Sequence, residues 1–400
     1  MHDNGGRSLR ERRQIVKPIR IGVIGCGKIA RIAHLPHFAA NPNCIITAVA
    51  DPDVKYLAAA QRKYRVQHAF RDPSDLLRNG PVDAVVVCSP NWVHAAQVVE
   101  AAERGLHVLC EKPLATSLAD CERMTEACAK AGVTLQVALQ KRFHPAFQLA
   151  REMIEAGELG EVFQISVDWN HYIPDLETSW LKKTLGFLER RGLDVLKDWG
   201  AWRLNDPRAG GGDFMDHGPH YLDLFRFLLG DFDLVSAEMK KVFPSRVHED
   251  HALCTVRFKS GALGHIERTQ NVVSRPYGHE TGAIHGTRGS LYFDSPHEYS
   301  LGHVRLYRYR MRNIVLDSRS RIRVPSGKKH RSYQKQADLF VARLADRGLD
   351  EVGFPATWAP TGEDGVLAVE AVLAAYLSSR EGRKISFPLT VEDRRLIEGE

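Results

Sequence analysis

A short apolar strand that runs into a glycine-rich turn restricts the fold of this chain more than any other feature. Residues 19–24 are mostly apolar, and Gly25-Cys26-Gly27-Lys28-Ile29-Ala30 follows them directly, with a helical stretch beyond. Such a turn lets the backbone approach a pyrophosphate closely, and the N–H groups of the next helix face its oxygens. A second apolar strand, residues 44–50, ends at Asp51, where a carboxylate can bind ribose hydroxyls. The pattern predicts a dinucleotide site.

Asp51 also indicates which dinucleotide is bound. Its carboxylate can accept hydrogen bonds from both adenosine ribose hydroxyls and would repel a 2′-phosphate, so NAD is expected rather than NADP. The alternatives are a tight turn with no ligand and, for Asp51, a turn-forming residue before Pro52. The residues expected at the cofactor from this pattern are Gly25, Gly27, Lys28, Ile29 and Asp51.

The first third of the chain alternates strands with helices. Further apolar strands are expected at 84–88, 106–110 and 134–138, with helices near 92–104 and 117–131. This alternation favours a parallel sheet with helices on both faces. We therefore expect a doubly wound, dinucleotide-binding Rossmann domain over residues 19–144, preceded by a flexible basic arm at 1–18.

The pattern changes after Phe143. A helix at 145–156 leads into strands with period-two alternation at 162–168, 234–242, 252–258 and 262–269, then at 279–285, 290–293 and 304–312. Helices return near 332–347 and 363–379. This is typical of a mostly antiparallel sheet with helices on one face. We expect an α+β domain over 145–390 and a tail at 391–400; the resemblance given below implies that this domain binds substrate and forms the oligomer.

Composition excludes several other classes of protein. The 400 residues are 44% hydrophobic and 26% charged, as in ordinary globular proteins. No apolar run approaches the roughly 18 residues of a membrane span. The seven cysteines form no C-x-x-C pair, and no metal-ligand spacing is present, so reduced thiols, no metal and a cytoplasmic location are expected. The polar, basic N-terminus lacks the apolar core of a secretory signal.

The net charge of +6 is concentrated in one stretch. Residues 303–331 hold ten Lys or Arg and one acid, so this stretch is +9 and the rest of the chain is −3. Within it, Arg308, Arg310 and Arg312 alternate with Tyr307, Tyr309 and Met311. The alternation favours a solvated strand face, or a site for a phosphorylated or nucleotide-linked sugar. No nucleic-acid motif accompanies the charge, and no such partner is expected.

Two further motifs follow strands of the expected parallel sheet. Ser89-Pro90-Asn91, with His94, follows one strand, and Glu111-Lys112-Pro113 follows the next. Open α/β sheets bind their ligands at the carboxyl ends of the strands. Lys112 held there can bind a substrate oxygen or move a proton; the alternative is a surface lysine at the start of a loop.

A third motif lies in the second half of the chain. It begins with Gly210-Gly211-Gly212, and Asp216, His220 and Asp223 follow at spacings that place them on one helix face. A carboxylate one turn from an imidazole can orient it, as a general base requires. Zinc is not expected, because no H-E-x-x-H or cysteine cluster accompanies the pair.

Taken together, these motifs resemble those of the Gfo/Idh/MocA oxidoreductases, the family of glucose–fructose oxidoreductase and inositol dehydrogenase. The resemblance also includes Arg142-Phe143, Trp202-Arg203 and the closing residues 383–389. The resemblance covers about residues 19–389. It implies a Rossmann domain followed by a mostly antiparallel α/β domain whose open sheet face builds a homodimer or homotetramer. It also implies a tightly held nicotinamide cofactor and a sugar or cyclitol substrate between the domains.

The resemblance assigns roles to residues of this chain. It implies that Lys112, Asp216 and His220 are catalytic. The cofactor set extends to Ser89, Pro90, Asn91, His94, Glu111, Lys112 and Gln140, and the substrate set is Lys112, Arg142, Trp202, Arg203, Asp216 and His220.

The expected activity is hydride transfer between NAD and a secondary hydroxyl or ketone of a sugar, cyclitol or sugar derivative. In oxidation, His220 takes the hydroxyl proton, Asp216 stabilises the imidazolium and Lys112 binds the same oxygen; whether Lys112 or His220 carries the proton stays open. The alternatives are an NAD-dependent glycoside hydrolase of the same superfamily and a non-catalytic NAD-binding regulator.

One segment departs from the family pattern. Most relatives have a short connection between residues 172 and 199. Here a mostly apolar helical stripe is formed by Trp180, Leu181, Thr184, Leu185 and Leu188, and the basic residues opposite it are Lys182, Lys183, Arg190 and Arg191. This extra segment is expected to be a lid over the cleft, a subunit contact or a decoration.

Overall fold

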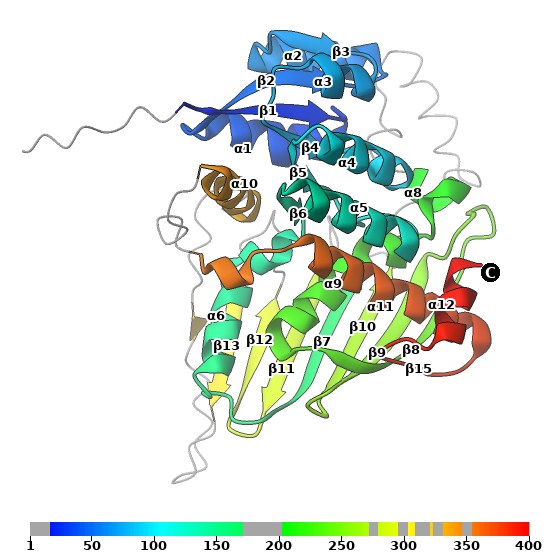
Figure 1. The fold of residues 1–400 in the computed structure, drawn as a ribbon. Helices are drawn as coiled ribbons and strands as arrows, with labels where there is room; N and C mark the ends of the chain where they lie inside the picture. The colour runs from blue at the N-terminus through cyan, green and yellow to red at the C-terminus, as the bar shows by residue number, and fades with distance from the viewer. Residues whose placement is uncertain are drawn as a thin grey trace, which may run out of the picture.

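The computed structural model describes residues 17–170, 202–271, 279–294, 303–308, 321–322, 331–345 and 354–399. Its strands form two sheets, which lie one above the other in Figure 1. Most of the predicted basic arm, the extra segment at 172–199 and much of the basic stretch at 303–331 lie outside the described residues.

The first sheet is parallel throughout, in the order β3-β2-β1-β4-β5-β6. Its strands are β1 Ile19–Ile24, β2 Cys44–Ala50, β3 His68–Phe70, β4 Ala84–Val87, β5 His107–Cys110 and β6 Leu135–Val137. The central strand β4 is four buried apolar residues, because helices cover both of its faces. The strand order reverses between β1 and β4, where doubly wound sheets bind ligands.

The helices around this sheet begin where the sequence provides capping groups. They are α1 Leu35–Ala40, α2 Val54–Tyr64, α3 Pro73–Asn79, α4 His94–Glu103 and α5 Leu118–Ala131. Asp53, Asp72 and Ser117 each accept a hydrogen bond from a main-chain N–H of the first helical turn. A wider helical turn, Ala30–His34, precedes α1.

The second sheet has nine strands in the order β14-β13-β12-β11-β7-β10-β9-β8-β15. They are β7 Val162–Asn170, β8 Phe232–Lys240, β9 His251–Phe258, β10 Leu263–Thr269, β11 His279–Gly286, β12 Gly289–Asp294, β13 His303–Arg308, β14 Arg321–Ile322 and β15 Ile385–Ser386. All neighbours are antiparallel except β7 and β10. Burial alternates residue by residue along β9, so one face is apolar.

Helices cover that apolar face. Figure 1 shows α6 Pro145–Glu155, α9 Asp213–Leu229 and α11 Gly362–Glu381 in front of the second sheet, with α12 Val391–Glu398 at its edge. The short α8 is Trp202–Asn205. By contrast, α10 Arg331–Leu344 packs with the first sheet, because Phe340 and Val341 share an apolar core with Ile21.

The predicted fold class is confirmed: a Rossmann sheet is followed by a mostly antiparallel sheet with helices on one face. The predicted strand at 304–312 is described only over His303–Arg308. The domain boundary near residue 144 stays a prediction; that residue lies between β6 and α6.

Candidate active site

A cavity of about 600 Å³ lies at the carboxyl ends of the first sheet's strands. The turn at 25–30, Asp51, the residues after β4 and the Glu111-Lys112-Pro113 segment all line it, and so do Trp202, Arg203 and Asp216 from beyond the first sheet. The cavity is therefore built where the sequence predicts a dinucleotide.

The two glycines of the turn are required for different reasons. Gly25 has a φ of +86°, and a Cβ there would lie 2.7 Å from the Cys88 carbonyl. A Cβ on Gly27 would meet nothing within 4 Å, so this glycine leaves open space in the cavity wall. A side chain at Gly27 would enter this open space. The space left by the two glycines fits the pyrophosphate of a dinucleotide.

Asp51 is held with its carboxylate in the cavity. One oxygen accepts a hydrogen bond from the Cys26 N–H at 2.6 Å, and the other accepts from the Asp53 N–H at 2.8 Å. Burial raises the pKa of Asp51, and these two N–H groups oppose the rise. The fixed carboxylate fits the ribose end of the dinucleotide.

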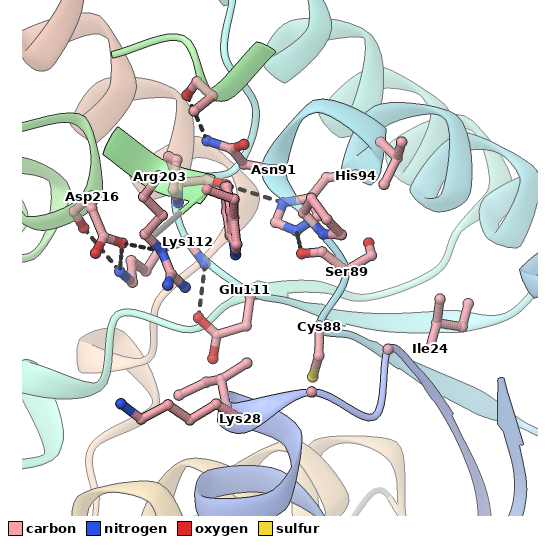
Figure 2. Close-up of a pocket in the computed structure, with 18 of the residues that line it drawn as sticks. Ile24, Lys28, Cys88, Ser89, Asn91, His94, Glu111, Lys112, Arg203 and Asp216 are labelled. Carbon is pink, nitrogen blue, oxygen red and sulfur yellow. Dashed lines mark hydrogen bonds and ion pairs between the residues drawn. The ribbon is translucent and has the colours of Figure 1, made fainter. Parts of the chain in front are cut away.

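The loop after β4 lines the cavity and also holds neighbouring segments together. The Asn91 amide donates to the Ala209 carbonyl at 2.9 Å, and Ser89 Oγ donates to Gln97. The ring nitrogens of His94 lie 2.9 Å from the Ser89 carbonyl and 3.1 Å from the Pro113 carbonyl, as Figure 2 shows in part. His94 therefore braces two cofactor-side loops against each other.

A second cavity, of about 200 Å³, shares a wall with the first. The shared residues are Lys28, Ile29, Glu111, Lys112, Arg203 and Asp216. The second cavity adds polar and aromatic groups: Gln140, Lys141, Trp169, His217, His220, Glu280 and Tyr333. Gln140, predicted at the cofactor, thus lines this smaller cavity, where its amide donates to the Tyr333 hydroxyl at 3.4 Å.

Lys112 and Asp216 form an ion pair in the shared wall. Lys112 Nζ lies 2.7 Å from Asp216 Oδ1 and donates to the Asp216 carbonyl at 2.9 Å, and Arg203 Nε lies 3.0 Å from the same Oδ1 (Figure 2). Burial alone would raise the pKa of Asp216, but Arg203 and Lys112 hold it well below its ordinary value.

His220 faces the smaller cavity from α9. It is 5% exposed, and its Nδ1 has no hydrogen-bond partner among the described residues. Burial and the charges of Lys112 and Lys141 hold its pKa well below the ordinary value, so the ring is neutral. The carboxylate of Asp216, predicted to orient His220, contacts Lys112 and Arg203 through Oδ1, and its Oδ2 lies 3.5 Å from His217 Nε2.

Close backbone contacts fix the start of α9. A Cβ on Gly211 would lie 2.3 Å from the Tyr376 hydroxyl, and one on Gly212 would lie 2.1 Å from the Glu249 carbonyl. The Glu249 carboxyl accepts from the N–H groups of Gly212 and Phe214, and burial raises its pKa to about 7. The glycine triplet thus lets α11 and the loop before β9 hold the helix that carries Asp216 and His220.

The structure does not place Arg142, a predicted substrate residue, with the other predicted site residues. Its guanidinium donates to Asp223 at 2.9 Å and to Asp364 at 2.7 Å, and it lines neither cavity. A buried charge must be paired, and these two carboxylates pair it. Asp223, placed by its spacing on the Asp216 face, belongs to this structural group.

Trp202, a predicted substrate residue, lines the larger cavity and not the smaller one. It packs edge-on against Trp92, with ring centroids 5.1 Å apart, and the Arg203 guanidinium lies 4.5 Å from the centre of its ring. In the part of the chain that the structure describes, no group of three or more His, Cys, Asp or Glu side chains is arranged to hold a metal.

Sequence analysis missed three pairs in the site. His217 Nδ1 lies 2.8 Å from Asp213 Oδ1, and their i, i+4 spacing was an available signal. Lys141 pairs with Glu280 at 2.6 Å, and His34 pairs with Glu111 at 2.7 Å. The partners in these last two pairs lie 139 and 77 residues apart, so no local pattern could reveal them.

Comparisons with known proteins agree with this geometry. Residues 19–139 match the oxidoreductase family with an NAD-binding Rossmann fold, and residues 147–292 match the Gfo/Idh/MocA C-terminal domain. The myo-inositol 2-dehydrogenase of Thermotoga maritima is 30% identical over 70% of this chain and 76% of its own length. The scyllo-inositol 2-dehydrogenase (NAD⁺) of Bacillus subtilis is 28% identical over 68% and 73%.

A solved structure extends the likeness to nearly the whole chain. The WlbA dehydrogenase of Chromobacterium violaceum, in complex with NADH and UDP-GlcNAcA, superposes with a TM-score of 0.75 at 25% identity, over 94% of this chain and 98% of that one. With both domains matched and the dinucleotide turn, Asp51, Lys112 and His220 in place, the chain belongs to the NAD-binding Gfo/Idh/MocA family of oxidoreductases.

Proposed function

We propose that this enzyme oxidises a secondary hydroxyl of a sugar or cyclitol, or reduces the matching ketone, with NAD. The observation that carries the proposal is the position of Lys112. Its Nζ lies in the wall between the dinucleotide cavity and the smaller cavity, where the neutral His220 ring also faces. A cation and a neutral base at one small cavity beside a nicotinamide site suit alcohol oxidation.

The chain's own groups divide the work. The turn at 25–30 and Asp51 hold the dinucleotide, which when bound supplies the acceptor or donor of hydride. Lys112, anchored by Asp216, donates a hydrogen bond to the substrate oxygen and favours its ionised form. His220 accepts the hydroxyl proton at a ring nitrogen during oxidation and returns it during reduction. The ionised Asp216 keeps Lys112 in place.

The lining of the smaller cavity supports a polyhydroxylated substrate. Gln140, Glu280 and His217 bring donors and acceptors, and Trp169 and Tyr333 bring aromatic surface. The inositol dehydrogenases among the relatives act on polyols of this kind. The WlbA structure holds a nucleotide-linked sugar, so the panel of test substrates includes such compounds.

The test is an absorbance assay for NADH against sugars, cyclitols and sugar nucleotides, with Lys112→Met and His220→Gln. Each variant should lose about 10²–10⁴ in kcat with the best substrate, the usual cost of losing a positioned acid–base group, while its Kd for NAD stays within a few-fold of wild type. The exposed Lys130→Met is the matched control and should behave as wild type. Near-normal turnover in both site variants, or no steady NADH formation with any compound, contradicts the proposal.

We also propose that the protein is a homodimer or homotetramer built on the open face of the second sheet. Phe163, Leu253 and Leu263 are 51%, 41% and 57% exposed on three neighbouring strands, so this face presents apolar side chains that a second copy could cover. Leu263→Asp should lower the mass measured by light scattering at micromolar concentration, whereas Val54→Asp, at an equally exposed site on α2, should not. A monomeric wild type would refute the proposal.

The state of the cysteines supports a cytoplasmic location as part of the same proposal. All seven are free and buried. A reducing compartment maintains such thiols. Among the described residues, no helix is both long and apolar enough to cross a membrane.

A further inference from the structure

His34 and Glu111 form a buried pair that the proposed reaction does not use. His34 Nε2 lies 2.7 Å from Glu111 Oε1, and the two side chains are 1% and 8% exposed. His34 ends the wide helical turn that follows the dinucleotide turn, and Glu111 directly precedes Lys112. A carboxylate this far from solvent is stable in its charged form only if donors reach it.

The groups around the pair hold Glu111 in its charged form. Tyr333 packs edge-on against His34, with the two ring centroids 6.3 Å apart. The Lys112 main-chain N–H donates to Glu111 Oε2 at 3.2 Å. Burial alone would raise the pKa of Glu111, but His34 and Lys112 hold it below the ordinary value.

The wall that Glu111 shares with Lys112 also carries the basic side chains of Lys28 and Arg203 and the acidic side chain of Asp216, whereas the nearby thiols are uncharged. Burial, assisted by Glu111, raises the pKa of the Cys88 and Cys110 thiols well above neutrality. Burial lowers the pKa of His94, while the main-chain carbonyl oxygens that its ring nitrogens face oppose this shift. Glu111 therefore places one negative charge next to the ammonium of Lys112.

The position of this charge matters because Glu111 lines both cavities. The larger cavity fits the dinucleotide and the smaller one receives the substrate, so the reactive end of the cofactor must approach their shared wall. The nicotinamide ring is cationic when oxidised and neutral when reduced. A fixed carboxylate near that wall therefore interacts differently with the two forms.

We propose that His34 is a positioning residue that keeps Glu111 ionised in the shared wall, and that this charge favours binding of NAD⁺ relative to NADH. The inference needs only NAD binding. It stands apart from the identity of the substrate, and its test uses no substrate.

The experiment measures the Kd of NADH by fluorescence and that of NAD⁺ by competition, at pH 7 and pH 9. In Glu111→Gln, which keeps the shape of the side chain but not its charge, the ratio Kd(NAD⁺)/Kd(NADH) should rise about tenfold or more at both pH values. A tenfold rise corresponds to a midpoint potential of the bound couple that is about 30 mV more positive.

Two substitutions of His34 separate positioning from mere packing. His34→Gln keeps an N–H donor within reach of Glu111, and its ratio should match wild type at both pH values. His34→Ala removes the donor, so Glu111 should take up a proton: the ratio should resemble Glu111→Gln at pH 7 and return toward wild type at pH 9. If His34→Ala does not fold, His34→Asn, whose shorter amide does not superpose on Nε2, replaces it.

A ratio within twofold of wild type in Glu111→Gln overturns the proposal. A shifted ratio in Glu111→Gln, together with wild-type behaviour of the His34→Ala or His34→Asn variant at both pH values, overturns the role of His34. A shift in His34→Gln equal to that in His34→Ala likewise shows that the donor is not what matters.

Discussion

Single residues decide the chemistry of the larger cavity, and Asp51 is the clearest case. Its two oxygens are held by the Cys26 and Asp53 N–H groups, so the carboxylate cannot turn away from the cavity. A 2′-phosphate placed against the same ribose would meet a fixed negative charge at short range. The sequence predicts this role from spacing alone, because the end of β2 and the turn after β1 are neighbours in any doubly wound sheet.

Replacing Asp51 should therefore change cofactor choice. In Asp51→Ser, the ratio of kcat/KM for NAD over NADP should fall at least about tenfold, because the repulsion of the 2′-phosphate is removed along with the ribose contact. Steady-state kinetics with both cofactors measures the ratio. Asp53→Ser, which keeps a good capping residue at the start of α2, should change it much less. A wild type that prefers NADP would contradict the assignment.

At the scale of elements, the N-terminus of α6 combines a cap with a titratable group. His144 Nδ1 accepts a hydrogen bond from the Ala146 N–H at 3.2 Å. Burial and the charge of Lys141 lower the pKa of His144 to about 4, from an ordinary value of 6.5. Between these two pH values, His144 is therefore protonated in the unfolded chain and neutral in the folded chain. The stability this group contributes is present above pH 6.5 and is lost as the pH falls toward 4.

His144→Asn tests this, since asparagine also caps helices but does not titrate. Between pH 7 and pH 5, wild type should lose about 2 kcal/mol more of its free energy of unfolding than the variant. Urea titrations at the two pH values give the difference. The comparison between proteins cancels other groups, such as Glu249, whose raised pKa acts in the opposite direction. Equal losses in the two proteins would show that His144 titrates normally.

The elements were predictable because their signals are local. Period-two and helical patterns placed most strands of both sheets and most of the longer helices within a few residues. They gave no bounds for β3, α2 and α3, and the predicted tail at 391–400 is mostly the helix α12. What could not be predicted depends on partners far away in the sequence. A guanidinium such as that of Arg142 is common at ligand-binding sites. Only the folded structure shows that Arg142 is buried against Asp223 and Asp364. The parallel pairing of β7 with β10 has no local signal either.

At the scale of the whole molecule, α11 connects the two sheets. A Cβ on Gly365 would lie 2.7 Å from Val137 of β6. Tyr376 of the same helix donates to Glu249, whose carboxyl accepts from the N–H groups at the start of α9. Leu114, two residues after Lys112, also packs against Gly365. One rigid helix thus fixes the segment that carries Lys112 relative to the helix that carries Asp216 and His220. This arrangement explains why residues 104 apart in sequence meet at 2.7 Å.

The wall that the two cavities share has a thermodynamic consequence. Because Lys112, Arg203 and Asp216 face both cavities, a molecule in one changes the surroundings of a molecule in the other. Linkage then requires that the substrate alter the Kd of NADH by the same factor by which NADH alters the Kd of the substrate. Calorimetry and fluorescence titrations with a nonreacting pair, NADH and the alcohol, should give two equal factors that differ from one. Factors of one would mean that NADH and the alcohol bind independently of each other. Any other value makes each ligand an effector of its partner, so that the affinity for the alcohol depends on how much of the enzyme holds NADH.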